Sequence, residues 1–459
     1  MTITFHAKPP RTRLKIAVVG SGISGLSAAW LLSRSHQVSV FESDDRIGGH
    51  SNTVEVDGTP VDTGFIVYNE LTYPNLTALF KHLDVPTKPS DMSFAVSLDD
   101  GAFEYSGSIS GLVAQRRNLV RPSYWSMMRD LTRFYRTAPL DAPGLGLTTL
   151  EEYLDAKNYG ASFRRDHLYP MAAAIWSTPA NDISQFPARA FIRFFDNHGL
   201  LNFGNRPTWR TVDGGSREYV KRLTETFTDN VFRKRAVKAI HRPGRNVIVE
   251  DSTGRLEEFD HVVIATHADH ALAMLDQPTA EEKNLLGAFH YIENEAVLHS
   301  DPSVMPKRKS VWSSWNYSAR RKGPSCKDLS VTYWMNRLQG IPDNKPMFMT
   351  LNTIRKPDPK LVHHSQSYSH PMYNAKAIAA QDELWSLQGV RNTWFCGSYF
   401  GAGFHEDGLQ SGLAVAEELG GDRRPWNVAE ESGRISLRRI AQNTDFESGW
   451  HEQDRILAV

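Results

Sequence analysis

The sequence predicts an α/β fold of two interleaved domains, and three observations support this prediction. A glycine-rich turn at residues 20–25 lies between a short apolar strand and a helix, as at the start of a βαβ unit. The 459 residues exceed what one hydrophobic core usually supports, so a second domain is expected. The segment NTWFCG at 392–397 is predicted as a last buried strand that leads through a glycine-rich loop into a helix.

The elements follow in order along the chain. The apolar pattern predicts a strand at 15–20, a helix at 23–35 and a strand at 37–41, and residues 71–205 are expected to be mostly helical. A hairpin is predicted at 245–266 around a Ser-Thr-Gly turn. The remaining predictions are strands at 295–299, 309–317, 330–336, 347–354 and 392–397, a helix at 408–419, and a charged tail from 421 to 459 that docks or is partly disordered.

Composition excludes several classes of protein. The 52 basic and 52 acidic residues give no net charge, which argues against a nucleic-acid partner. Cys326 and Cys396 are too few for a disulfide framework, which favours a cytoplasmic location. The first residues lack the apolar core of a secretory signal, and no segment approaches about 20 uninterrupted apolar residues.

The glycine-rich turn reads Gly20-Ser21-Gly22-Ile23-Ser24-Gly25. In a Rossmann-like domain the first glycine permits the tight turn, the second lets the backbone approach a pyrophosphate, and the third lets helix and strand pack closely. Glu42 ends the next strand, where a carboxylate can bind both hydroxyls of an adenosine ribose. The same carboxylate would repel a 2′-phosphate, so the turn predicts a dinucleotide other than NADP.

A second glycine pair follows in Arg46-Ile47-Gly48-Gly49, and it suggests a ligand longer than NAD. With Asp62-Thr63-Gly64 and the element at 395–412, these blocks resemble the FAD-binding pattern of the flavin amine oxidase superfamily, which also contains phytoene-type desaturases and protoporphyrinogen oxidases. The blocks TYPNLTALFKHLDVPT, SSWNY, VTYWMNRLQ and GFHEDGLQSGLAVAEELG are most similar to a bacterial branch of NAD/FAD-binding oxidoreductases whose genes neighbour fatty-acid-methylating enzymes of the cyclopropane synthase type.

The resemblance implies a Rossmann-like FAD-binding domain at 13–70, 206–275 and 390–420, interleaved with a mixed-sheet plus helical substrate domain at 71–205 and 276–389. It also implies non-covalent FAD, with Val237 at the adenine and the start of the helix at Gly408 and Leu409 directed at the flavin N1–C2=O edge. The implied cofactor-binding residues are Gly20, Gly22, Ser24, Gly25, Glu42, Arg46, Gly49, Val237, Gly397, Gly408 and Leu409.

The sequence departs from the amine oxidases around the expected flavin. Tyr399 replaces a glutamate, Phe404 replaces one tyrosine or tryptophan of the aromatic pair that flanks the amine, and the other member falls near Ser369-His370. No cysteine lies there for a thioether link to flavin, and the stretch HSDPSV at 299–304 supplies no lysine at the position where the family has one near the flavin. The candidate catalytic residues are therefore His370, His405, Tyr399 and Phe404. Residues 267–270, His-Ala-Asp-His, have no companion ligands, and no metal is expected.

These departures weigh against amine chemistry. The resemblance to the fatty-acid-associated branch implies an FAD-dependent oxidoreductase that takes a hydride from a hydrophobic substrate and desaturates a methylated fatty acyl chain, with a lipid methyltransferase as a partner. Two alternatives remain: an amine or polyamine oxidase, and a non-catalytic flavin-binding partner of a lipid-modifying enzyme.

Residues 112–138 contain six arginines and one acidic residue, interleaved with aromatic and methionine side chains. This composition predicts peripheral contact with an anionic membrane, at the inner membrane surface. The alternative is a solvated helix face whose aromatic side chains pack inward.

Overall fold

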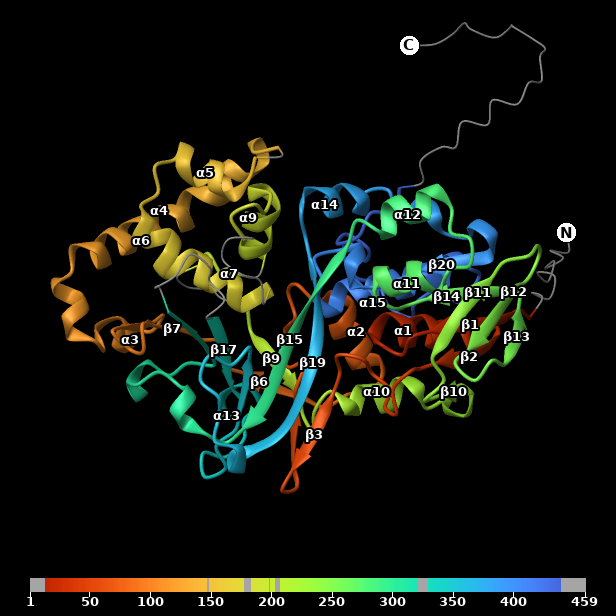
Figure 1. The fold of residues 1–459 in the computed structure, drawn as a ribbon, viewed down its shortest axis with the longest axis horizontal. Coiled ribbons are helices and arrows are strands. Elements are labelled where there is room, and N and C mark those ends of the chain that lie inside the picture. The colour runs from red at the N-terminus through yellow and green to blue at the C-terminus, as the bar shows by residue number, and fades with distance from the viewer. Residues whose placement is uncertain are drawn as a thin grey trace, which may run out of the picture.

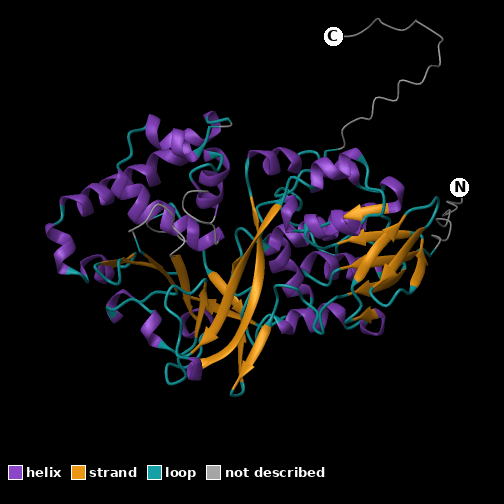
Figure 2. Ribbon diagram, viewed as in Figure 1, coloured by secondary structure: helices purple, strands orange, loops and turns teal. Residues whose placement is uncertain are grey.

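The computed structural model describes residues 13–146, 148–176, 183–197, 199–202, 207–320 and 329–438. The molecule has two lobes (Figure 1), joined by the long antiparallel strands β15 (His290–His299) and β19 (Val362–Met372). Helices and a parallel sheet form one lobe, and a mixed sheet topped by a group of helices forms the other (Figure 2). Cys326 and residues 439–459 of the predicted tail lie outside the described residues.

The first lobe is built on a parallel sheet in the order β10-β2-β1-β14-β20. Its strands are β1 (Lys15–Val19), β2 (Gln37–Phe41), β10 (Val231–Phe232), β14 (His261–Ile264) and β20 (Thr393–Phe395). The predicted hairpin at 245–266 is wrong in its second half. β12 (Val247–Asp251) and β13 (Leu256–Phe259) pair in a small sheet with β11 (Val237–His241), but β14 leaves that sheet and pairs with β1.

Two helices from opposite ends of the chain pack beside the parallel sheet. α1 (Ile23–Leu32) is buried along its whole length, and α15 (His405–Glu418) lies against it. A Cβ atom on Gly412 would lie 2.2 Å from the Ser24 carbonyl oxygen, so only glycine permits this approach. The predicted helix start at 408 is wrong by three residues, because Phe404 caps a helix that begins at His405.

The second lobe contains a mixed sheet in the order β19-β15-β18-β17-β16-β7-β8. Its shorter strands are β7 (Phe94–Leu98), β8 (Phe103–Ser106), β16 (Trp315–Ala319), β17 (Leu329–Trp334) and β18 (Phe348–Leu351). The predicted strand at 309–317 begins only at Trp315, and β7 and β8 lie in a region predicted to be mostly helical. The remaining strands are β3 (Thr53–Val56) with β4 (Thr59–Asp62), and β5 (Tyr68–Asn69) and β6 (Thr87–Ser90) on either side of β9 (Trp209–Val212).

The helices group around the two sheets. Those of the second lobe are α3 (Ile109–Val113), α4 (Pro122–Asp141), α5 (Leu150–Ala156), α6 (Ala161–Phe163), α7 (Tyr169–Trp176), α9 (Ala188–Asn197) and α13 (Met335–Gln339). The others are α2 (Pro74–His82), α10 (Arg217–Thr224), α11 (Ala268–Met274), α12 (Ala280–Leu286) and α14 (Ala375–Gln381). The described part of the tail docks on the first lobe, where buried Arg424 bonds Asn75 and Glu417.

Candidate functional site

A cavity of about 680 Å³ runs from the carboxyl edge of the parallel sheet to the mixed sheet and the helices of the second lobe. Its volume falls in the range of about 300–1,000 Å³ that is typical of ligand sites. Of the predicted site residues, the following line it: Gly20, Gly22, Ser24, Glu42, Gly49, Val237, His370, Gly397, Tyr399, Phe404, His405 and Gly408. The cavity therefore brings together residues from both ends of the chain.

The glycine-rich turn shapes one end of the cavity. Gly20 has a φ of +100°, and a Cβ atom there would lie 2.8 Å from the Ala265 carbonyl oxygen. A Cβ atom on Gly25 would lie 2.0 Å from the Gly20 carbonyl oxygen, so this glycine serves packing and does not line the cavity. Gly22 differs, because a Cβ atom there would meet nothing within 4 Å. Its open side leaves room at the place where a pyrophosphate is predicted.

Glu42 lies beside this turn. One carboxylate oxygen accepts from the Ser21 backbone N–H at 3.0 Å, and the other accepts from the Asp44 N–H at 2.9 Å. The carboxylate is thus held at the cavity wall, where an adenosine ribose is predicted. Arg46 does not line the cavity; its guanidinium donates to the Gly49 carbonyl at 2.8 Å and fixes the second glycine turn.

The start of α15 supplies different backbone donors from those predicted. Gly408 donates its N–H to the Phe404 carbonyl at 3.2 Å, and the buried Leu409 does not line the cavity. The first turn of the helix, from His405, therefore carries the N–H groups that no carbonyl within the helix can accept. That these N–H groups point at the N1–C2=O edge of the flavin stays a prediction.

Four partly buried histidines line the cavity: His50, His267, His370 and His405. Burial is the main cause that lowers the pKa of each, to about 4 for His267 and His370 and to about 3 for His405. Burial and then the neighbouring His370 lower the pKa of His50 well below its usual value. All four are therefore neutral at pH 7. The sequence analysis missed His50, although it directly follows the Gly48-Gly49 pair.

His405 is connected to two hydroxyl groups. Its Nε2 lies 2.7 Å from the Tyr219 hydroxyl and 3.2 Å from the Ser51 hydroxyl, and those two hydroxyls also bond each other. The ring stacks on Phe65 with centroids 3.9 Å apart. Burial raises the pKa of Tyr219, which stays a neutral phenol. The neutral imidazole of His405 at the cavity wall is thus hydrogen-bonded to a pair of linked hydroxyl groups.

His370 has a defined tautomer. Asn294 accepts from the Asn352 side chain at 2.6 Å through its amide oxygen, which directs its NH₂ group toward His370. That NH₂ donates to His370 Nδ1 at 2.9 Å. The neutral ring therefore carries its proton on Nε2 and acts as a hydrogen-bond donor there.

Several buried polar atoms of the cavity wall have no partner among the described residues. They are His267 Nδ1, Trp315 Nε1, Tyr373 Oη and Tyr399 Oη. Buried groups of this kind normally have a hydrogen-bond partner, so their grouping around one cavity indicates a ligand with polar atoms. Together with the open side of Gly22, they fit FAD, whose pyrophosphate lies between an adenosine at one end and a flavin ring at the other.

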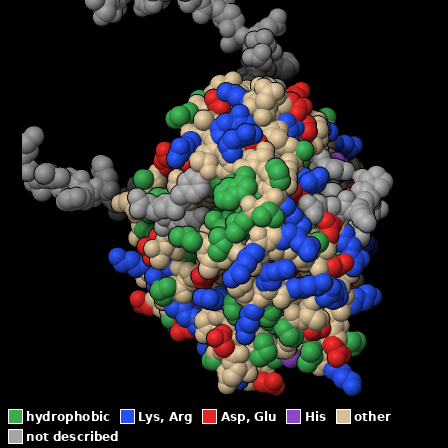
Figure 3. Space-filling model, turned by 90° about the vertical axis from the view of Figure 1, so that its left-hand side faces the viewer, with side chains coloured by type: hydrophobic (Ala, Val, Ile, Leu, Met, Phe, Trp, Pro, Cys, Tyr) green, Lys and Arg blue, Asp and Glu red, His purple; other side chains and the backbone are tan. Residues whose placement is uncertain are grey.

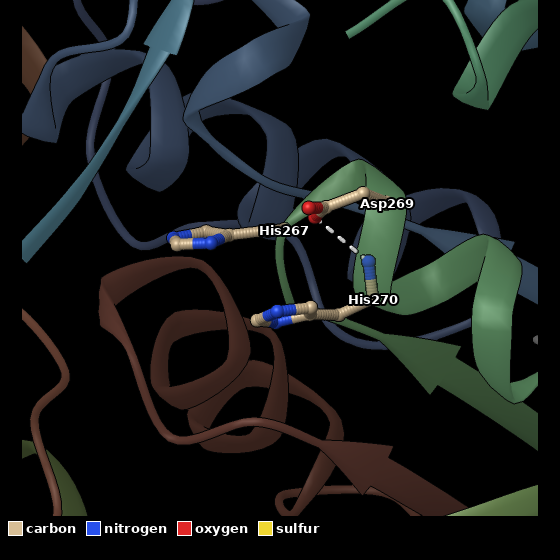
Figure 4. Close-up of side chains that lie close together, drawn as sticks. All are labelled: His267, Asp269 and His270. Carbon is tan, nitrogen blue, oxygen red and sulfur yellow. Dashed lines mark hydrogen bonds between the residues drawn. The ribbon is translucent and has the colours of Figure 1, made fainter. Parts of the chain in front are cut away.

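His267, Asp269 and His270 have ligand atoms within 4.8 Å of one another (Figure 4). The two imidazole rings are stacked, with centroids 5.2 Å apart and 24° between their planes. A metal lies in the plane of each imidazole that binds it, so these rings do not converge on one ion. Asp269 instead accepts the His270 backbone N–H at 2.8 Å. We propose no metal at this cluster.

Cys396 is buried and does not line the cavity, and burial raises the pKa of its thiol to about 12. We therefore expect non-covalent FAD. The purified protein should be yellow, and denaturation with acid should release all of the FAD into the supernatant, where chromatography identifies it. Flavin that stays with the precipitated chain, or release of NAD alone, would contradict this expectation.

Comparison with known proteins agrees with the geometry. The family model for flavin containing amine oxidoreductases matches residues 23–300. A putative flavin-containing monoamine oxidase from Mycobacterium tuberculosis is 29% identical over 299 residues, which are 63% of this chain and 65% of that protein. The matched region thus spans less than two thirds of that relative.

Two solved structures share the fold at 14% identity. A putrescine oxidase has a TM-score of 0.63 and covers 89% of this chain and 99% of its own, and a fatty acid isomerase from P. acnes has a TM-score of 0.63 with 90% and 99% covered. The predicted Rossmann-like fold with a mixed-sheet substrate lobe is confirmed, whereas the exact domain boundaries stay predictions. The chain belongs to the flavin containing amine oxidoreductase family, and its cofactor is FAD.

Proposed function

We propose that this protein is an FAD-dependent oxidoreductase that desaturates a hydrophobic substrate, preferably a methylated fatty acyl chain. Bound FAD supplies the hydride acceptor. The chain itself supplies the cavity, the orientation of the substrate and a path for the proton. Its relatives include a putative monoamine oxidase, and the shared fold serves both an amine oxidase and a fatty acid isomerase, so the choice of substrate rests on the cavity.

The proposal rests on the side chains that line the end of the cavity farthest from the glycine-rich turn. Among the described residues that line the cavity, Glu42 is the sole acidic one, and it lies beside the glycine-rich turn, at the end predicted for the adenosine. A polyamine would need carboxylates for its ammonium groups. The other end is instead lined by Ile66, Val67, Met92, Ile175, Phe194, Leu200, Trp209, Trp315, Tyr333 and Leu351. An acyl chain suits this lining.

The histidines support proton removal. Forming a double bond requires a proton to leave the carbon next to the one that loses the hydride. His405 is neutral because burial lowers its pKa to about 3, and its link to Tyr219 and Ser51 offers a path for that proton. His370, with its proton on Nε2, can orient a polar group of the substrate. Phe404 stacks on Phe194 with centroids 4.8 Å apart and adds to the apolar wall.

Anaerobic reduction of the flavin tests the substrate. Methyl-branched phospholipid should bleach the visible flavin band in the absence of oxygen, because its chain can enter the apolar end, whereas putrescine and spermidine should not. Bleaching by a polyamine alone would contradict the acyl-chain proposal and favour an amine oxidase. Absence of bleaching with either class, together with a stable complex with a lipid methyltransferase, would favour the flavin-binding partner.

Two variants separate chemistry from folding in this assay. His405→Gln should keep its FAD but bleach at least about tenfold more slowly, in line with the loss of a positioned base. His363→Gln, at an exposed position on β19, should bleach at the rate of the parent. Equal rates for all three proteins would remove His405 from the mechanism.

A lipid-methyltransferase partner and a cytoplasmic location at the inner membrane surface belong to the same proposal. The partner follows from the resemblance to the fatty-acid-associated branch, and the location follows from the two cysteines and the arginines of residues 112–138. No described helix is long and apolar enough to cross a membrane.

A further inference from the structure

An exposed surface on the second lobe combines apolar and basic side chains. It is formed by α3, the 3₁₀ helix Arg116–Val120 and the first turn of α4. Ile109 is 86% exposed, Val120 80%, Trp125 56% and Val113 49%. Exposed Arg116 and Arg117 lie between them in the chain. We call these six residues the docking surface.

Hydrogen bonds from three side chains to backbone carbonyls hold the segments of the docking surface in place. Tyr124 donates its hydroxyl to the Leu112 carbonyl at 2.9 Å, which ties α4 to α3. The Asn118 side chain donates to the Glu104 carbonyl at 2.9 Å, and the Trp125 indole N–H donates to the Leu119 carbonyl at 2.8 Å. The apolar side chains are therefore presented by an ordered scaffold, with the indole ring fixed at its polar edge and open on its apolar face.

The charge around the docking surface is positive. Residues 107–140 contain six arginines and one acidic residue, Asp130, whose side chain is 2% exposed and accepts the Gly160 N–H. Arg116, Arg117 and Arg136 form no ion pair with a described residue, whereas Arg164 on the same lobe lies between Glu151 and Asp155. On this face of the molecule Lys and Arg side chains lie around and between hydrophobic ones (Figure 3). The chain as a whole has no net charge, so this face is a local departure.

We propose that the docking surface binds an anionic lipid bilayer. Arginines attract the headgroups, and exposed aliphatic side chains with an amphipathic tryptophan insert at the boundary of headgroups and acyl chains. A nucleic acid or an acidic protein would pair with the arginines but would leave Ile109 and Val120 in water. The combination of both side-chain types favours lipid.

The location of the surface agrees with this partner. α4 packs against α9, and Phe194 of α9 lines the apolar end of the cavity. One helix, α4, therefore both contributes its first turn to the docking surface and contacts a helix that lines the cavity. Binding itself does not depend on the substrate, so it can be tested apart from the proposed reaction.

Flotation with vesicles tests the proposal on the FAD-loaded protein. The parent should float with vesicles that contain phosphatidylglycerol and not with pure phosphatidylcholine. Arg116→Glu with Arg117→Glu should lower the partition constant by roughly thirtyfold or more in low salt. Ile109→Ser with Val120→Ser should lower it by roughly tenfold or more, since two inserted side chains are lost.

The matched control is Arg233→Glu with Arg245→Glu, which makes the same change in charge on exposed residues of the other lobe. It should float as the parent does. The proposal is overturned if the parent does not bind phosphatidylglycerol, or if the control loses as much binding as Arg116→Glu with Arg117→Glu. Full binding by the Ile109 and Val120 variant would also overturn it, because a purely electrostatic surface would suit any polyanion. FAD content and anaerobic bleaching by detergent-dispersed substrate should be the same in all variants.

Discussion

Gly22→Val should lose nearly all of its FAD while keeping its fold. The backbone of Gly22 has a φ of −70° and a ψ of 178°, which valine adopts readily. A Cβ atom there meets nothing in the protein, so the new side chain enters the space that we assign to the pyrophosphate. We expect the flavin content per chain to fall below about one tenth of that of the parent, because backbone donors can no longer reach the phosphates.

The loss should come from the ligand and not from unfolding. A valine at this N-cap position costs about 1 kcal/mol relative to glycine, which is small for a protein of this size. Circular dichroism and the urea midpoint of the flavin-free proteins measure that cost. Gly244→Val is the control, since Gly244 also has open space around it but lies in an exposed turn. A Gly22→Val protein with full FAD would show that the first turn is not the phosphate site.

His167 should make the protein less stable as the pH falls. It is buried among the helices of the second lobe, with Nδ1 at 2.9 Å from the Tyr105 hydroxyl and Nε2 at 3.1 Å from the Tyr135 hydroxyl. Burial lowers its pKa to about 3. Between pH 6.5 and 3 the unfolded chain takes up a proton that the folded chain does not, so the stabilisation present above pH 6.5 is lost as the pH falls. Two pH units below 6.5, the free energy of unfolding should have dropped by about 3 kcal/mol from this residue.

His167→Gln isolates this contribution from those of the other buried histidines. The variant should be less stable than the parent at pH 7.5, and by pH 4.5 the difference should have shrunk by about 3 kcal/mol. Urea unfolding of the flavin-free proteins at both pH values provides the comparison. His290→Gln, at an exposed position, should keep a constant difference from the parent. A constant difference for His167→Gln as well would mean that the imidazole has the same pKa in the folded and the unfolded chain.

The nucleotide end of the site could be predicted because its signals are local. Gly20, Gly22 and Glu42 follow one another within a single βαβ unit. Steric restrictions require glycine at fixed positions of the turn, so the spacing of these residues can be recognised in the sequence. The substrate lobe lacked such signals. β19 reads VHHSQSYSHPM, with little alternation and a proline, and it becomes a strand through its long pairing with β15. β7 (FAVSL) and β8 (FEYS) are short and show no alternation of buried and exposed residues, and they become strands because β7 pairs with β16 and β8 pairs with β7.

The histidine cluster shows the same limit. His370 and His405 were candidates because each lies in a block that resembles the family, but their surroundings come from elsewhere. Asn294 and Tyr219, which set the hydrogen bonds of these rings, lie 76 and 186 residues away in the sequence. Single-sequence patterns contain no record of such pairings.

The interleaving of β1, β14 and β20 in one sheet has a consequence for synthesis of the protein. The glycine turn leaves the ribosome early, but the strand and helix that complete its surroundings, β20 and α15, are more than 370 residues farther along the chain. FAD therefore meets only a partial site until the chain is almost complete. Contacts of this sequence separation slow folding, and the exposed edge of the half-built parallel sheet is prone to wrong pairing in the meantime. Recombinant yield should thus depend on the supply of FAD and chaperones at the end of translation, and a chain that ends before α15 should accumulate without cofactor.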